Sequence, residues 1–249
     1  MYGKATKRAK QTQKKGDIHP MLAEIKVPGD CVSVDCLSSG TKGLIAQISG
    51  TLTKQRYQHA CVFVDHKSDL SYTHLLKTQS AAELIEAKES FEAYADSCGV
   101  IIKHYHADNG VFKSRKWVDS CNAAKQGLTF AGVNGHHQNG RAERRIRSLQ
   151  DMACTSMIHS AHRWPDAITA NLWPYAIRAA NDTVNNTPCA RLDYKLTPVQ
   201  AFSGTTVDVN PIHWQPFGCP VYVLTEALQK NSFQNKWKER SRMGVYLGR

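Results

Sequence analysis

The sequence predicts an α/β domain built on a mixed sheet, antiparallel on one side, parallel on the other and covered by helices. The chain has 249 residues, and its 41% hydrophobic and 21% charged residues are globular values. Three segments with strand character precede the first helical segment, and strands and helices alternate after it. No apolar run approaches the roughly 20 residues that span a bilayer, so no membrane partner is expected. One main domain with extensions fits this length.

The amino-terminal part of this domain supplies four strands and one helix. The stretch CVSVDCL is strand-like through its valines, and the polar, glycine-containing stretch after it predicts a loop. Two further strands flank a short polar turn and form a hairpin, and the next apolar residues recur at helical spacing until Gly99 ends the helix. The predicted ranges are a strand at 31–37, a loop at 38–59, strands at 60–66 and 70–76, a helix at 80–97 and a strand at 100–107.

The rest of the chain alternates before it becomes irregular. A glycine- and asparagine-rich loop precedes the third helix, whose apolar residues fall on one face. In the fourth helical stretch Pro165 suits the first turn, and Pro174 should kink or divide it. The predicted ranges are a helix at 114–126, a strand at 128–131, a loop at 132–140, a helix containing 142–157, a helical stretch at 164–185 and strands at 217–224 and 244–248.

The net charge of +11 is concentrated at the two ends of the chain. Residues 1–20 carry six Lys or Arg and one Asp, and residues 230–249 carry six Lys or Arg and one Glu. This distribution indicates a core with basic amino- and carboxyl-terminal extensions that contact a polyanion such as DNA or RNA. The alternative is that the basic ends only keep the protein soluble.

The eight cysteines predict neither disulfides nor a cysteine zinc site. The basic start MYGKATKRAK is followed by no apolar stretch, so it is not a secretory signal. Without such a signal thiols are expected. No two cysteines form a C-x-x-C pair.

Three carboxylates converge in the predicted topology. Asp35 lies late in the first strand and Asp108 just after the fourth, so parallel pairing of these strands would bring them to one edge of the sheet. Glu143 falls in the first turn of the third helix, about 80° from the centre of its apolar stripe at 100° per residue. Three carboxylates together are costly without a cation, and hard oxygen ligands select Mg²⁺ or Mn²⁺. Two such ions can act on a phosphodiester.

The stretch HYHADNG offers a second interpretation of Asp108. His104, His106 and Asp108 alternate, so on a strand they point to one face. H-x-H-x-D occurs in zinc hydrolases of the metallo-β-lactamase type, but that motif continues with D-H, and here Asn109 follows. We interpret the two histidines as strand residues near the carboxylates, with the zinc-dependent hydrolase kept as an alternative.

The blocks VSVDCL, HADNG and HHQNGRAERRIRSL resemble the D,D,E catalytic core of retroelement integrases. The pattern is most similar to that of copia-type LTR retrotransposons, in which Q-N-G-x-A-E-R opens the glutamate helix. Between Asp108 and Glu143 lie 34 residues, close to the family's usual gap. The resemblance also covers the segments MYGKATKR, FGCPVYVL and SRMGVYLG.

This resemblance implies a division of the chain into three parts. Residues 31–188 would form an RNase H-like integrase catalytic core with a mixed five-stranded sheet. Residues 1–30 would be a basic linker after a zinc-binding domain that lies upstream, and 189–249 a carboxyl-terminal extension of the integrase region. The chain is therefore expected to be a fragment of a polyprotein, with zinc only in the upstream domain.

The resemblance also implies the activity. The enzyme would be a polynucleotidyl transferase and endonuclease that processes DNA 3′ ends and inserts element DNA into host DNA in the nucleus, after assembly in cytoplasmic particles. Asp35 would bridge two Mg²⁺ or Mn²⁺ ions, Asp108 would hold one of them and Glu143 the other. The partners would be element-end DNA, target DNA and further copies of the chain assembled on DNA, with no small-molecule substrate. The alternative is a catalytically inactive fragment that only binds nucleic acid.

Polar and basic residues around Glu143 are candidates for contact with DNA. The arginines could equally form a solvated helix face, and the two amide side chains before the helix could simply cap it. The candidate residues are Gln138, Asn139, Arg141, Arg144 and Arg147.

Overall fold

The fold is taken from a computed structural model that describes residues 25–46, 53–132, 139–205, 214–230, 235 and 237–248. The strands are β1 Val32–Gly43, β2 Tyr57–Asp65, β3 Ser71–Leu76, β4 His104–Ala107, β5 Gly127–Phe130, β6 Pro220–Leu224 and β7 Ser241–Val245. The helices are α1 Ala81–Ser97, α2 Arg115–Ala123, α3 Gly140–Arg163, α4 Trp173–Asn185, α5 Pro198–Ser203 and α6 Glu226–Gln229. Three short 3-10 turns are η2 Val111–Lys113, η4 Ala170–Leu172 and η5 Ala190–Leu192.

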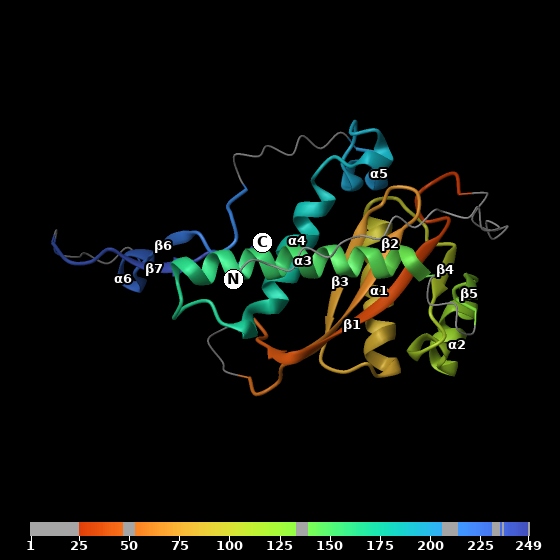
Figure 1. Cartoon of the computed structure of the whole chain (residues 1–249), viewed down its shortest axis with the longest axis horizontal. Helices are drawn as coiled ribbons and strands as arrows, with labels where there is room; N and C mark the ends of the chain where they lie inside the picture. The colour runs from red at the N-terminus through yellow and green to blue at the C-terminus, as the bar shows by residue number, and fades with distance from the viewer. Residues whose placement is uncertain are drawn as a thin grey trace, which may run out of the picture.

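The central sheet is mixed, as the sequence predicts. Its strand order is β3-β2-β1-β4-β5. β2 pairs antiparallel with β1 and β3, whereas β4 pairs parallel with β1 and β5. The five-stranded sheet flanked by helices is an RNase H-like core (Figure 1).

Two apolar cores cover the two faces of this sheet. Alternate side chains of a strand point to opposite faces, so Val34 packs with Phe91 of α1 and Trp117 of α2, while Leu37 packs with Leu149 of α3. α1 and α2 therefore cover one face, and α3 and α4 cover the other.

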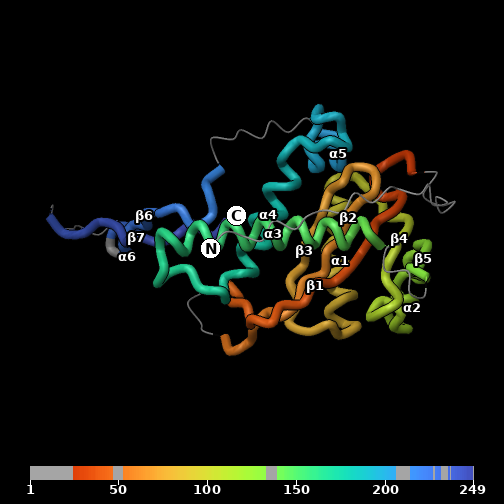
Figure 2. Tube along the Cα trace, in the orientation of Figure 1, coloured from red at the N-terminus to blue at the C-terminus, as the bar shows by residue number. Residues whose placement is uncertain are grey.

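The carboxyl-terminal segment packs in two places. Phe202 of α5 stacks on Tyr94 of α1, with ring centroids 6.2 Å apart. The β6–β7 hairpin lies beyond the end of α3, away from the sheet (Figure 2). The chain reaches it through Phe217, whose carbonyl accepts a hydrogen bond from the Ser160 hydroxyl at 2.9 Å.

Two predicted strand boundaries are wrong. β1 continues to Gly43, into the range predicted as a loop, because residues after 37 still pair with β2 across a register shift between Ser38 and Gly43. Gly43 also lies against α4, where an added Cβ would fall 2.3 Å from Pro174 Cγ. The predicted strand at 100–107 begins only at His104.

Two predictions near the carboxyl terminus are also wrong. The stretch 164–185 is not one helix, because α3 extends to Arg163, a turn follows, and α4 begins only at Trp173. Pro174 therefore lies in the first turn of α4, where proline is tolerated, and Pro165 does not begin a helix. The strand predicted at 244–248 lies at 241–245.

All eight cysteines are free thiols. Among the helices that the structure describes, none combines the length and the apolar character needed to cross a bilayer.

Candidate active site

Asp35 and Asp108 occupy neighbouring positions at the edge of the sheet where the parallel pairing of β1 with β4 ends. Val34 of β1 pairs with Ala107 of β4, and Asp35 and Asp108 are the residues that directly follow these two. Paired strands lie about 4.8 Å apart, so the two side chains begin close together. Asp35 is the fourth residue of a strand that is longer than predicted, not a late one.

The Asp35 carboxylate belongs to the α3 face of the sheet. Val34 lies in the core under α1 and α2, whereas Leu37 lies in the core under α3. Alternation along the strand places Asp35 on the same face as Leu37. The sheet edge and the start of α3 therefore enclose the site from two sides.

Glu143 approaches from α3. It lies in the first turn of this helix, half-buried, between the buried residues Ala142 and Ile146. The first turn was its predicted position. Figure 1 shows α3 crossing the face of the sheet, with its first turns at the end nearest β4.

Asn139 fastens the start of α3 to the sheet beside Asp35. It is the N-cap residue, yet its side chain makes no capping hydrogen bond. Instead it is 1% exposed, and its Nδ2 donates to the carbonyl of Val34 at 3.0 Å. Sequence reasoning did not find this positioning role, because no local pattern signals a contact between residues 105 positions apart.

The carboxylates influence one another electrostatically. Burial, and after it the charges of Asp108 and Glu143, raise the pKa of Asp35 to about 6. A hydrogen bond from the Cys36 amide to Asp35 Oδ1, at 2.8 Å, acts in the opposite direction. The three predicted acids therefore lie close enough for the charges of Asp108 and Glu143 to act on Asp35.

The loop after β4 orients Asp108. The Gly110 amide donates to Asp108 Oδ1 at 3.1 Å, and an added Cβ at Gly110 would lie 3.1 Å from Oδ2. The side-chain amide of Asn109 donates to the carbonyl of Ala131, which follows β5. Asn109 and Gly110 therefore fix the D-N-G turn around the carboxylate.

The two histidines of the HYHADNG stretch face β5. His104 Nε2 and His106 Nδ1 each lie 2.9 Å from Thr129 Oγ1. His66 contacts β1 instead, where its Nε2 lies 2.7 Å from Ser33 Oγ, and burial followed by the charge of Arg141 lowers the pKa of His66 to about 3. These contacts favour the interpretation of His104 and His106 as strand residues beside the site.

The arginines of α3 differ in their surroundings. Arg141 donates to the carbonyl of His66, and burial, then the charge of Arg191, lowers its pKa to about 10, so it stays protonated at neutral pH. Arg144 and Arg147 are exposed, and Arg144 Nε donates to the Gly140 carbonyl at 2.7 Å. Gln138 lies outside the described residues.

Within the described ranges, no three His, Cys, Asp or Glu side chains are grouped closely enough to hold a metal ion. The side chains of Asp35, Asp108 and Glu143 nevertheless supply carboxylate oxygens, which are the ligands that a hard divalent cation prefers. The charges of Asp108 and Glu143 also act on Asp35, whose pKa they raise after the larger effect of burial.

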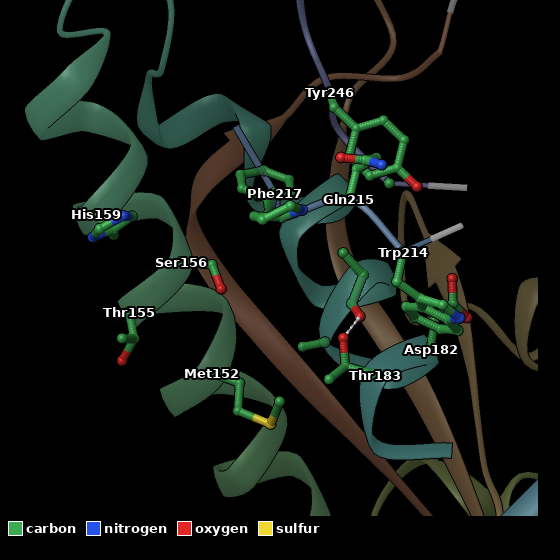
Figure 3. Close-up of a pocket in the computed structure, with 14 residues that line it drawn as sticks. Met152, Thr155, Ser156, His159, Asp182, Thr183, Trp214, Gln215, Phe217 and Tyr246 are labelled. Carbon is green, nitrogen blue, oxygen red and sulfur yellow. Dashed lines mark hydrogen bonds between the residues drawn. The ribbon is translucent and has the colours of Figure 1, made fainter. Parts of the chain in front are cut away.

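A separate cavity of about 370 Å³ lies between α3, α4 and the carboxyl-terminal segment (Figure 3). Its labelled lining residues are Met152, Thr155, Ser156, His159, Asp182, Thr183, Trp214, Gln215, Phe217 and Tyr246. Of the described residues that line it, only Asp182 carries a carboxylate, so this cavity lacks the donor set found around Asp35.

No family model matches the sequence, and no curated protein matches it. Among solved structures, the chain is similar to the HTLV-2 integrase catalytic core domain in complex with magnesium, in its trimeric form. The identity is 18% and the TM-score 0.48, over 71% of this chain and 97% of that one. It is also similar to the catalytic core domain of BIV integrase, with 16% identity and a TM-score of 0.45, over 69% and 92% of the two chains.

A third similarity has a higher TM-score. A chain of the simian T-cell lymphotropic virus intasome, in complex with PP2A regulatory subunit B56 gamma, matches with 14% identity and a TM-score of 0.52. The match covers 87% of this chain and 69% of that one. At this identity the likeness concerns the fold alone.

Proposed function

We propose that this chain is the catalytic core of a retrotransposon integrase of the copia type. The enzyme would trim the 3′ ends of element DNA and join them to host DNA. The observation that carries the proposal is the convergence of Asp35, Asp108 and Glu143 at one edge of an RNase H-like sheet, where their charges interact. Element-end DNA and target DNA would be the substrates, and further copies of the chain would assemble on them, in the nucleus.

The three carboxylates would hold two Mg²⁺ or Mn²⁺ ions. Asp35 would bridge them, Asp108 would bind one and Glu143 the other. When bound, such ions activate the attacking water or hydroxyl and stabilise the leaving oxygen of a phosphodiester. Asp35 must lose its proton before it can bind, and its pKa of about 6 places that step below neutral pH.

Other residues keep this arrangement in place. Asn139 holds the first turn of α3 on β1, so Glu143 stays over the sheet edge. Asn109 ties the loop after Asp108 to the end of β5. Exposed Arg144 and Arg147 lie on α3 near Glu143 and would contact DNA phosphates.

The experiment is a Mn²⁺-dependent nicking and strand-transfer assay with element-end DNA. We expect product only with the metal, and none from Asp35→Asn, Asp108→Asn or Glu143→Gln. Nicking by these variants at the wild-type rate would disprove the proposal. DNA binding without any nicking would identify a non-catalytic fragment.

The same assay separates the integrase from the zinc-dependent hydrolase. His104→Ala should keep metal-dependent nicking, because the contact found for His104 Nε2 is with Thr129. If this variant loses metal as completely as Asp108→Asn does, His104, His106 and Asp108 form a metal triad and the integrase assignment is wrong.

A further inference from the structure

A pocket rich in arginine lies on the flank of α3 that faces the β2–β3 turn. It has a volume of about 290 Å³, and we call it the arginine pocket. Its lining residues are Asp69, Arg141, Arg144, Arg145, Ser148 and Arg191. Arg191 was not among the residues that the sequence marked for DNA contact, and it comes from η5, beyond the predicted catalytic core.

The Asp69 carboxylate pairs with two of these arginines. Arg145 Nη2 lies 2.5 Å from Asp69 Oδ2 and also donates to the Asp69 carbonyl at 2.9 Å. Arg145 is 10% exposed, so this pair anchors α3 to the turn. Arg191 is 47% exposed and reaches Asp69 Oδ1 only at 3.6 Å, so its guanidinium is held loosely.

The other two arginines bond to neutral groups. Arg141 donates to the carbonyl of His66, and Arg144 donates to the carbonyl of Gly140. Asp65, the nearby buried acid, accepts hydrogen bonds from Gly29 and Ser68 instead. Among the described lining residues, four guanidinium groups thus share one carboxylate, and the pocket carries excess positive charge.

The pocket lies across α3 from the carboxylates. At 100° per residue, Arg145 is about 200° from Glu143 around the helix, so the two residues occupy opposite flanks. Those flanks are roughly 10–12 Å apart, the width of a helix. A strand that rises about 3.4 Å per nucleotide covers this distance in roughly three to four nucleotides.

We propose that the arginine pocket binds one backbone phosphate of the strand whose phosphodiester lies at Asp35, Asp108 and Glu143, which rests on the proposed function. Guanidinium groups suit this task because their planar fork matches phosphate oxygens. Arg191 and Arg144 donate to the phosphate, while Arg145 and Asp69 keep the pocket in shape. The phosphate replaces the weak pairing of Arg191 with Asp69.

The test is the salt dependence of binding to a fluorescently labelled DNA duplex, measured by anisotropy in EDTA so that no metal contributes. Arg191→Gln should lower the slope of log K against log salt by the contribution of about one phosphate. Between 50 and 200 mM salt, the ratio of the two Kd values then falls roughly 3.5-fold relative to wild type, because each phosphate contributes a slope of about 0.9.

The matched control is Arg115→Gln. Arg115 is 94% exposed on α2, on the other face of the sheet, and pairs with Asp119 at 3.7 Å. It should leave the slope unchanged, and thermal unfolding should confirm that both variants fold. If Arg191→Gln behaves like Arg115→Gln while wild type binds DNA, the inference is wrong. Failure of the proposed function would instead appear as DNA binding with normal Arg191 dependence and no nicking.

A second measurement locates the phosphate. Single methylphosphonate groups, which are neutral, are placed along the strand near the cleaved bond. At one position, a few nucleotides from that bond, the substitution should reduce the wild-type slope but leave the slope of Arg191→Gln unchanged. The inference fails if no methylphosphonate position has an effect that depends on Arg191. It also fails if Arg191 is required for the binding of polyglutamate, an acidic peptide, but not for the binding of DNA.

Discussion

Asp35 is half-buried, yet its carboxylate must be charged to bind a cation. Burial disfavours its ionised form, and Asp108 and Glu143 disfavour it further. Without metal the folded protein therefore holds a proton at Asp35 up to a pH of about 6, above the value of 3.8 for a free carboxyl. The site is destabilising until a cation compensates it.

Asp35→Asn should therefore stabilise the metal-free protein at neutral pH. The folded state binds the proton more tightly than the unfolded state, so wild-type stability is complete below pH 3.8 and decreases as the pH rises to about 6. Asparagine keeps an oxygen for the Cys36 amide and carries no charge. We expect a gain of about 1–2 kcal/mol in the free energy of unfolding near pH 7.5, and almost none near pH 4.

Urea unfolding in EDTA at the two pH values measures this difference. Addition of Mn²⁺ should stabilise wild type but not the variant, because only wild type binds the ion tightly. A variant that is less stable than wild type at pH 7.5 would show that the Asp35 carboxylate has a structural role.

At the scale of elements, the attachment of α3 to β1 decides where Glu143 lies. Asn139→Ala removes the hydrogen bond to the Val34 carbonyl and leaves a buried acceptor, at a cost of about 1–3 kcal/mol. The first turn of α3 should then shift, and nicking should fall roughly 10- to 100-fold. Initial rates in Mn²⁺ and urea unfolding measure the two effects.

Asn186→Ala is the matched control, since Asn186 also donates to a backbone carbonyl, that of Asp182, at 2.8 Å, but it does so at the carboxyl end of α4. It should lower stability without a selective loss of nicking. If both variants lose activity only in proportion to stability, Asn139 does not position Glu143.

The packing of the carboxyl-terminal segment on α3 depends on one glycine. Gly218 has φ +78°, and an added Cβ would lie 2.1 Å from Ser160 Oγ. Gly218→Ala should therefore detach residues 217–219 from α3 and speed hydrogen exchange in β6 and β7. The melting temperature of the core should change little, because this hairpin lies away from the sheet. Gly40→Ala, with nothing within 4 Å of the added Cβ, should have no such effect on the hairpin.

The sequence predicted the elements whose patterns are local. The hairpin, α1 and the parallel pairing of β1 with β4 followed from alternation, helical spacing and element order. The extension of β1 to Gly43 did not, because polar and glycine residues there are held by tertiary contacts such as the Trp173 indole donating to the Thr41 carbonyl at 2.8 Å. For the same reason the start of α4 at Trp173 could not be told from a kink.

At the scale of the whole molecule, the excess positive charge is concentrated at the two ends of the chain. Residues 1–20 carry six Lys or Arg and one Asp. Deleting them should weaken DNA binding and flatten its salt dependence, by about 0.9 in slope for each phosphate that these residues neutralise. Anisotropy titrations at several salt concentrations measure this, with a Gly/Ser segment of equal length as the control.

An unchanged slope after the deletion would mean that the amino-terminal charges serve solubility alone.

The candidate site could be predicted from the sequence only in part. Motif spacing and topology pointed to Asp35, Asp108 and Glu143, but Asn139 and the arginine pocket depend on contacts between distant segments, such as Arg145 with Asp69.

The long strand β1 sets the order in which a nascent chain can mature. Its carboxyl end is held only after the chain around the start of α4 has been made. The Leu44 amide donates to the Asn171 carbonyl at 2.8 Å, and the Trp173 indole donates to the Thr41 carbonyl. The start of β3 waits for the same helix, because Asn185 receives a hydrogen bond from the Ser71 amide. Ribosomes add roughly 5–20 residues per second, so the chain from Gly43 to the start of α4 takes roughly 6 to 26 seconds to make, and β1 stays incomplete for that time. A ribosome that stalls while α4 is still in the exit tunnel would thus expose Asp35 and Asp108 on an unfinished sheet, and chaperone dependence should end only when α4 leaves the tunnel.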